Sequence, residues 1–159
     1  MSVLYKRADS LVGISDARDE LIRRLTEGDG DVHSRQLKIV SLVGPAGVGK
    51  TTLAKVLYDN FRPSFHCTAF VPFSPTPSMK KVLLSICKVL GITEYQDDMH
   101  KASWGQTKII NDLQNFLQNK RYLIILDDIW ETKSWTTIKQ ALVNNNHGSI
   151  IVTTTRMQA

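Results

Sequence analysis

The sequence GPAGVGKTT, residues 44–52, has the spacing of a loop that binds phosphate groups. Phosphate oxygens need several N–H donors that converge from one side, and glycines allow the backbone to curl tightly enough to supply them. An apolar run precedes this loop and a helical pattern follows it, so the positive end of the helix dipole faces the anion. The residues expected to bind nucleotide phosphates here are Gly44, Gly47, Val48, Gly49, Lys50, Thr51 and Thr52.

Three side chains of this loop have distinct expected roles. Lys50 places an ammonium group against the β and γ phosphates, and the Thr51 hydroxyl can ligate Mg²⁺. Thr52 is placed to reach an inner phosphate. The loop therefore predicts a bound nucleotide together with magnesium.

A pair of carboxylates follows the apolar run YLIIL, residues 122–126. The run predicts a buried strand that delivers Asp127 and Asp128 to its carboxyl end. Mg²⁺ prefers oxygen ligands and keeps several waters, so one carboxylate holding it through water suffices, and we assign this role to Asp127. A second carboxylate can orient or deprotonate the attacking water, which we assign to Asp128. Lys50 and Asp128 are thus the expected catalytic residues, and Thr51 and Asp127 the expected metal site.

Strand patterns and helix patterns alternate along the chain. Strands are expected at 37–43, 68–73, 122–126 and 149–155, and Pro72 with the PTP segment at 75–77 confines the second of them to an edge or a short element. Helices are expected after Ser15, after the phosphate loop to about residue 60, from Ser78 to Gly91, after a capping box of Ser103 and Gln106, and around Trp135 and Ile138. The alternation indicates an α/β fold with a mainly parallel sheet, whose ligands bind beyond the carboxyl ends of the strands.

The composition is that of one globular domain of 159 residues, with 42% hydrophobic and 22% charged residues. No apolar run is long enough to span a membrane and the start lacks a secretory signal, so we expect a cytoplasmic protein. Cys67 and Cys87 are interpreted as buried thiols in a reducing compartment. The net charge of +5 arises from scattered basic residues, which form no stripe of the kind that binds nucleic acid.

Two further candidate nucleotide contacts, with weaker sequence signals than the phosphate loop, lie near the ends of the chain. Arg156 follows an expected strand, where its cation could sense a γ phosphate, although such an arginine is more often only on the surface. Val12, Gly13 and Ile14 precede the first expected helix and could pack on an adenine face, or simply lead into that helix. The residues alone leave both alternatives open.

Several motifs, in this order, resemble the opening blocks of the NB-ARC domain of plant nucleotide-binding leucine-rich-repeat (NLR) immune receptors. The motifs are LVGISDARDELIRRL, GPAGVGKTT, FHCTAFVPFSPTPSMKKVLLSIC, YLIILDDIW and GSIIVTTTR. The resemblance runs from about Ser10 to Arg156, leaving residues 1–9 as an N-terminal flank. The motif LDDIW, which Trp130 closes, resembles that of the receptors that carry an N-terminal coiled coil rather than a TIR domain. The whole chain, 1–159, is then expected to be the nucleotide-binding subdomain.

This resemblance implies a three-layer P-loop NTPase of the STAND/ASCE type, truncated before its last strand and the ARC subdomains. In the family, the VGI block borders adenine and the arginine after the TT pair senses the nucleotide, which supports Val12, Gly13, Ile14 and Arg156 as binding residues. The family holds ADP at rest and exchanges it for ATP, so the implied module is a switch with at most slow Mg-dependent ATP hydrolysis. The implied partners are the remaining receptor domains or other NLR chains.

The family's sheet order has a further consequence for the strand that precedes the phosphate loop. The strands that end near Asp127 and Arg156 lie on one side of it, and the strand that covers its other side comes later in the family sequence. We therefore expect residues 37–43 to form an open apolar edge, with marginal stability or self-association of the chain.

Two other functions are compatible with the sequence. An autonomous P-loop phosphotransferase, such as a small kinase, would need an acceptor site and a basic lid, and the chain has no arginine-rich segment of that kind. An adaptor or decoy would keep the fold and act through protein contacts alone. Binding of ADP without an acceptor would distinguish the switch from both.

Overall fold

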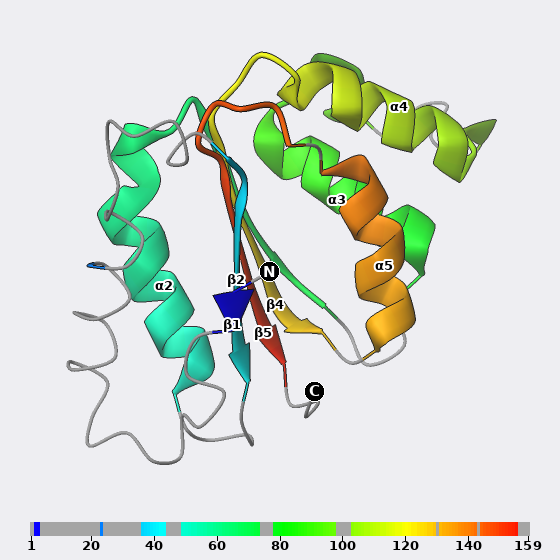
Figure 1. Cartoon of the computed structure of the whole chain (residues 1–159). Coiled ribbons are helices and arrows are strands. Elements are labelled where there is room, and N and C mark those ends of the chain that lie inside the picture. Colours follow the sequence, from blue (N-terminus) through cyan, green and yellow to red (C-terminus); the bar gives the residue numbers. More distant parts are fainter. Residues whose placement is uncertain are drawn as a thin grey trace.

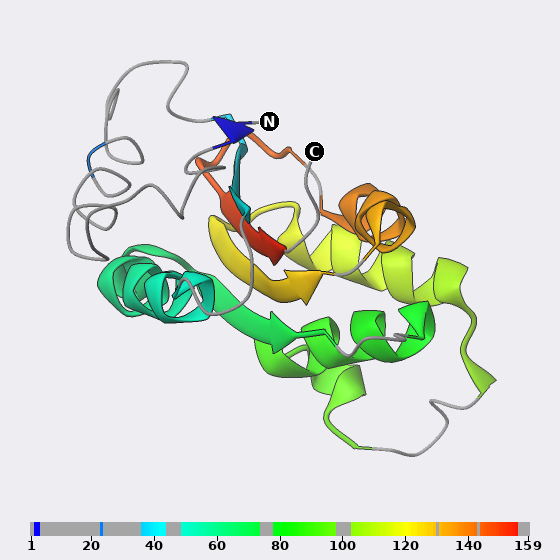
Figure 2. The same ribbon diagram turned by 90° about the horizontal axis from the view of Figure 1, so that it is seen from below.

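A computed structural model describes residues 2–3, 23, 36–43, 49–73, 78–97, 103–129, 131–142 and 144–155. Within these residues a parallel sheet has the strand order β1-β2-β5-β4-β3. Helix α2 covers one face of the sheet, and α3, α4 and α5 lie on the other (Figures 1 and 2). The predicted three-layer α/β fold with a mainly parallel sheet is confirmed.

The elements agree with the predicted alternation. The strands are β1 (Ser2–Val3), β2 (Lys38–Val43), β3 (Cys67–Pro72), β4 (Tyr122–Ile129) and β5 (Ile150–Thr155). The helices are α2 (Lys50–Phe61), α3 (Met79–Leu90), α4 (Gln106–Leu117) and α5 (Thr132–Ala141), with short 3₁₀ turns η3 (Arg62–Ser64) and η4 (Thr93–Tyr95). Strand β3 lies at the edge of the sheet, as its proline predicted. The helix predicted after Ser15 falls outside the described residues except for Arg23, which is helical.

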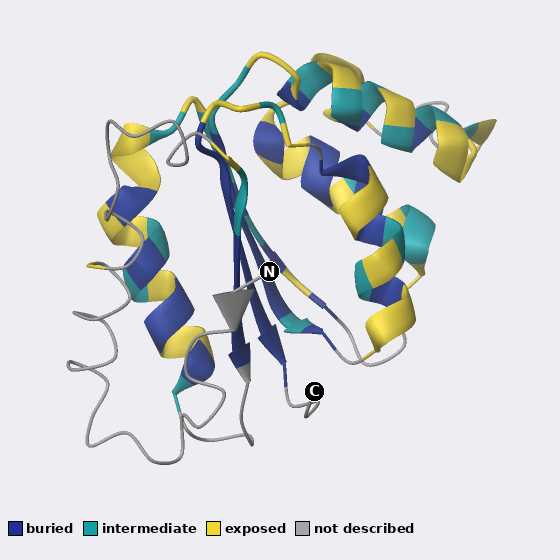
Figure 3. Cartoon of the chain, in the orientation of Figure 1, coloured by how far each residue is buried: buried dark blue, intermediate teal, exposed yellow. Residues whose placement is uncertain are grey.

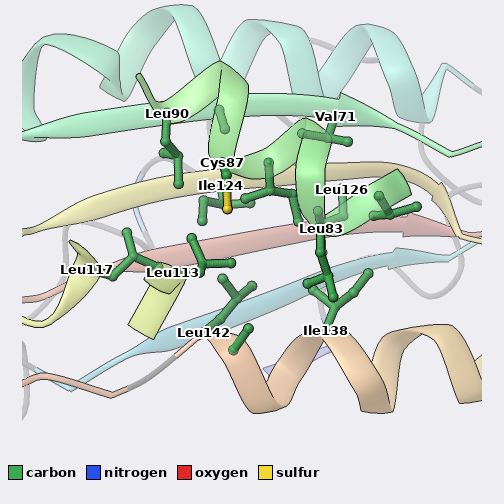
Figure 4. Close-up of a cluster of buried hydrophobic side chains, with 14 of the residues drawn as sticks. Val71, Leu83, Cys87, Leu90, Leu113, Leu117, Ile124, Leu126, Ile138 and Leu142 are labelled. Atoms are coloured by element: carbon green, nitrogen blue, oxygen red, sulfur yellow. The ribbon is translucent and has the colours of Figure 1, made fainter. Parts of the chain in front are cut away.

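The apolar strands are buried on both faces because successive side chains point to opposite sides of the sheet. The core beneath α2 contains Val40, Leu42, Leu123, Ile125, Ile150 and Val152 from the strands. The larger core beneath the other helices contains Ile39, Ile124, Leu126 and Ile151. In Figure 4, Leu83, Cys87, Leu113, Leu117 and Ile138 converge on Ile124 and Leu126. The buried sheet between helices with exposed outer faces is visible in Figure 3.

The caps of α3 are those the sequence predicted, whereas the cap of α4 is different. The Ser78 hydroxyl accepts a hydrogen bond from Lys81 N at 3.5 Å, and Gly91 ends α3 with a φ of 88°. Helix α4 begins only at Gln106, after Gly105, and has no side-chain cap, so the predicted capping box at Ser103 is wrong. A tertiary contact holds this segment instead: the rings of Trp104 and Tyr95 pack edge to face, with their centroids 4.9 Å apart.

The neighbours of β2 confirm part of the predicted order and correct the rest. Strands β5, β4 and β3 lie on one side of β2, as predicted. On the other side, Ser2 and Val3 pair in parallel with Val40 and Ser41, so the edge is not open at these two positions. The side chains of Val40 and Ser41 are also buried, and the prediction of an open apolar edge is wrong there.

No helix among the described residues is both long enough and apolar enough to cross a membrane. Neither cysteine forms a disulfide, and Cys87 is buried whereas Cys67 is half-buried. Burial raises the pKa of the Cys67 thiol to about 11, although Lys120 acts in the opposite direction. The prediction of a buried thiol is therefore confirmed for Cys87 and only partly met by Cys67, and the reducing compartment stays a prediction.

We predict that neither thiol reacts with Ellman's reagent at pH 8 in the folded protein. The raised pKa makes the reactive thiolate of Cys67 about a hundredfold rarer than that of an exposed thiol, and Cys87 is inaccessible. The control is the same chain in guanidinium, where both thiols should react. Rapid release of one equivalent of thionitrobenzoate from the folded protein would contradict this prediction.

Candidate functional site

The candidate site lies where the carboxyl ends of β2, β4 and β5 meet the first turn of α2 (Figure 1). All three strands run in parallel, so these ends share one edge of the sheet. Strand β2 leads through residues 44–48 into α2, and β4 delivers its two aspartates to the same edge. The fold thus brings the phosphate loop and the acidic strand end together.

Gly49 is the described residue of the phosphate loop where the backbone turns into the helix. It adopts φ 86° and ψ 20°, a left-handed conformation that glycine reaches without the steric cost of a Cβ. Its carbonyl accepts the hydrogen bond of Leu53 N at 2.9 Å, so the helix begins directly at the loop. The N-terminal amides of α2 therefore point toward the loop, as the binding of an anion requires.

The side chains that follow Gly49 differ in their exposure. Lys50 is the first residue of α2 and its side chain is largely buried, with 9% of its surface exposed. Thr51 and Thr52 are exposed in the same turn. The first turn of α2 contains no acidic residue, and the helix dipole at this end favours a negative charge, so a phosphate group here would be stabilised by both the helix and Lys50.

A hydrogen bond joins the loop to the acidic strand. The Thr51 hydroxyl lies 3.0 Å from Asp127 Oδ1 and 3.1 Å from Oδ2, across 76 positions of the sequence. Asp127 is 7% exposed, so its carboxylate is largely removed from water. The two residues predicted to share a metal ion are therefore in contact.

Strand β4 continues past the predicted end at Leu126 through an irregularity. Its register with β5 shifts between Leu126 and Ile129, and Asp128 has a φ of 66°. Positive φ is uncommon outside glycine, although aspartate tolerates it better than most residues. The irregularity separates the directions of the two aspartates, leaving Asp127 buried and Asp128 partly exposed.

The threonines at the end of β5 form hydrogen bonds that the sequence analysis did not anticipate. The Thr154 hydroxyl accepts a hydrogen bond from Asp128 N at 2.8 Å and donates one to Asp127 Oδ1 at 2.6 Å. Thr153 donates to Ser41 Oγ at 3.0 Å, and Thr155 donates to the Ile129 carbonyl at 2.7 Å. The available signal was a run of threonines at the end of an otherwise apolar strand.

Seven of the predicted site residues lie outside the described part of the chain. They are Val12, Gly13, Ile14, Gly44, Gly47, Val48 and Arg156. Their expected contacts with adenine, phosphate amides and the γ phosphate stay predictions. The structure brings together Lys50, Thr51, Thr52, Asp127 and Asp128 at one end of the sheet.

The donor set suits magnesium. Thr51 and Asp127 offer a hydroxyl and a carboxylate, which are the hard oxygen ligands that Mg²⁺ prefers. Among the described residues, no three histidine, cysteine, aspartate or glutamate side chains are grouped so that they could hold a metal ion together.

Comparison with known proteins finds one matching family model and several similar plant disease resistance proteins. The model of the NB-ARC domain family matches residues 14–159. The chain is 37% identical over 145 residues to disease resistance protein RGA5 of Oryza sativa subsp. japonica, covering 91% of this chain and 12% of that protein. It is 34% identical over 157 residues to ToMV resistance protein Tm-2(2) of Solanum lycopersicum, covering 96% of this chain and 17% of that protein. It is 30% identical over 151 residues to disease resistance protein RPP13 of Arabidopsis thaliana, covering 94% of this chain and 18% of that protein.

The backbone of Asp128 provides a test of the site geometry. Asp128→Val should lower the free energy of unfolding by about 1–2 kcal/mol, because a β-branched residue is disfavoured at φ 66°. Asp128→Asn removes the charge but tolerates this conformation, so its effect should stay below ~1 kcal/mol. Chemical denaturation of both variants measures the difference, and equal destabilisation would contradict the positive φ.

Proposed function

Since this chain belongs to the NB-ARC family, we propose that its nucleotide-binding site takes ADP and ATP and serves as the switch of a plant immune receptor. The observation that carries the proposal is the contact between Thr51 and Asp127, which joins the phosphate loop to the acidic strand end. That contact unites the two halves of a magnesium–nucleotide site from segments that are far apart in the sequence.

In this proposal the diphosphate tail lies against the first turn of α2. The amides around Gly44, Gly47, Val48 and Gly49 donate to its oxygens, and Lys50 supplies the ammonium that neutralises them. Burial supports the role of Lys50, because a desolvated cation interacts more strongly with an anion than an exposed one does. The exposed Thr52 hydroxyl, in the same turn, is assigned to an inner phosphate.

Magnesium would be held by the Thr51 hydroxyl and, through water, by the Asp127 carboxylate. When bound, it would neutralise charge on the outer phosphates. Thr51 and Thr154 both donate to Asp127, which keeps the carboxylate oriented in its buried position. The protein's own contribution is thus to fix the oxygen ligands.

Hydrolysis is proposed to be slow, with Asp128 orienting or deprotonating the attacking water. Its partly exposed position beside the buried Asp127 supports this division of roles between the two carboxylates. The chain is then at most a slow Mg-dependent ATPase.

The remaining assignments follow the family. Val12, Gly13 and Ile14 are proposed to border the adenine ring, and Arg156 to sense the outer phosphate. The chain spans between 12% and 18% of the length of the three relatives named above, so the partners proposed are other receptor domains or other NLR chains. Self-association and a cytoplasmic location are also proposals, the second supported by the absence of a disulfide between the two cysteines.

Isothermal titration of the purified chain with ADP and ATP, without any acceptor, tests the proposed function. Binding of ADP is expected for the switch. Turnover that requires a second substrate would favour a phosphotransferase, and the absence of binding by folded protein with magnesium would favour an adaptor and overturn the proposal.

Lys50→Arg should weaken ADP binding by about ten- to hundredfold. The planar guanidinium is larger than the ammonium and cannot occupy the same buried place beside the loop. The matched control is Lys55→Arg, a change of the same type at an exposed position of the same helix, which should leave ADP affinity unchanged. Unchanged affinity in Lys50→Arg would refute the role of Lys50.

Asp128→Asn should slow single-turnover ATP hydrolysis at least about tenfold while leaving ADP affinity largely intact. Asparagine tolerates the positive φ of this position, so the variant removes the carboxylate without disturbing the backbone. Asp59→Asn, at an exposed position of α2, is the control for loss of one negative charge. Hydrolysis at the normal rate in Asp128→Asn would remove the catalytic assignment of Asp128.

A further inference from the structure

The hydroxyl of Thr154 occupies a central place in the described hydrogen bonds of the site. Thr154 is 1% exposed and lies at the end of β5, between the strand that leads into the phosphate loop and the strand that carries the aspartates. Its oxygen is 2.8 Å from Asp128 N and 2.6 Å from Asp127 Oδ1. One side chain therefore contacts two consecutive residues of the acidic strand end.

The direction of both hydrogen bonds is determined by chemistry. An amide N–H can only donate, so Thr154 Oγ1 accepts from Asp128 N. An ionised carboxylate can only accept, so the single hydroxyl proton of Thr154 points to Asp127 Oδ1. The hydroxyl is thus fixed in one orientation, and its short bond to the carboxylate is charge-assisted.

The position of these contacts coincides with the irregularity of β4. The amide that Thr154 accepts from belongs to Asp128, whose φ of 66° lies where the register with β5 shifts. A backbone in a sparsely populated conformation persists only when its surroundings hold it there. Thr154 holds this backbone and, with the same atom, orients the neighbouring carboxylate.

We propose that Thr154 is a positioning residue that couples the turn of the backbone at Asp128 to the orientation of the Asp127 carboxylate toward the nucleotide-bound metal. The inference rests on the proposed nucleotide site. Asp127 accepts from Thr51 at both oxygens, so two hydroxyls on different elements restrain it. Without Thr154, the hydrogen bonds among the described residues leave the carboxylate with the restraint from Thr51 on α2, so it would rotate more freely.

The neighbouring threonines provide matched controls, because their hydroxyls have other partners. Thr153 donates to Ser41 Oγ on β2 and is also buried, with 5% of its surface exposed. Thr153→Val therefore removes a buried hydroxyl one position away without touching the aspartates. Thr154→Val removes the Thr154 hydroxyl at nearly constant shape, and Thr154→Ser retains a hydroxyl at this position.

The experiment measures metal and nucleotide affinity separately on the 159-residue chain. ADP affinity is measured in EDTA, and Mn²⁺ affinity of the protein–ADP complex is measured by electron paramagnetic resonance, Mn²⁺ serving as the probe for a site of oxygen ligands. Thr154→Val should weaken Mn²⁺ binding about tenfold with ADP affinity in EDTA unchanged. Thr154→Ser and Thr153→Val should both bind Mn²⁺ like the parent chain.

A second measurement needs no nucleotide. Hydrogen exchange of the Asp128 amide, followed by NMR, should be at least tenfold faster in Thr154→Val than in the parent chain, and should be restored in Thr154→Ser. Circular dichroism establishes that each variant is folded. If Thr154→Val is unfolded, Thr154→Ala takes its place. Its Mn²⁺ affinity and Asp128 amide exchange are then compared with those of Thr154→Ser, with the same expected differences.

The outcomes separate the two proposals. A parent chain that binds ADP, with equal Mn²⁺ affinity and equal Asp128 exchange in Thr154→Val, would overturn the role of Thr154 alone. A folded parent chain that binds no ADP would overturn the nucleotide site, and the metal role of Thr154 with it. An equal loss of Mn²⁺ affinity in Thr153→Val would show a merely structural effect of buried hydroxyls and would also overturn the inference.

Discussion

The carboxylate of Asp127 is the point at which three separate segments of the chain meet. It accepts hydrogen bonds from Thr51 on α2 and Thr154 on β5, while it stands itself near the end of β4. Burying a charge is costly unless hydrogen bonds replace the lost water, and two hydroxyls fulfil that condition here. The arrangement of the candidate site depends on this interaction, because it sets the distance between the phosphate loop and the acidic strand end.

The apolar sheet makes such a contact possible. Strands β2, β5 and β4 are covered on both faces, and each buried leucine or isoleucine contributes about 1.5–3 kcal/mol to stability. This packing fixes the register of the strands, since a slip by one residue would exchange the two cores. The polar groups of the site are confined to the strand ends, where the register has already been determined. The chemistry at this edge therefore depends on a core that takes no part in it.

The sequence predicted the elements far better than their irregular ends. Residue spacing and the hydrophobic pattern identify β2, β4, the α3 caps and the turn into α2 at Gly49, because these features depend on local conformation and hydrophobic period. The start of α4 was missed because packing of Trp104 on Tyr95 overrides the local capping signal. The irregularity at Asp128 and the contacts of Thr154 were missed for a related reason. Both arise between strands that are distant in sequence, and no local pattern encodes their register.

The position of β5 explains why small hydroxyl residues stand at its end. Because β5 lies between β2 and β4, the loop strand and the acidic strand are separated by two strand spacings, about 10 Å of backbone. Thr51 and Asp127 must reach one another across the end of β5, so the residue there must be short. It must also be polar, since a buried apolar side chain would leave the Asp128 amide and one carboxylate oxygen without this hydrogen-bond partner. Threonine meets both conditions, and its β-branched shape also suits the strand that presents it.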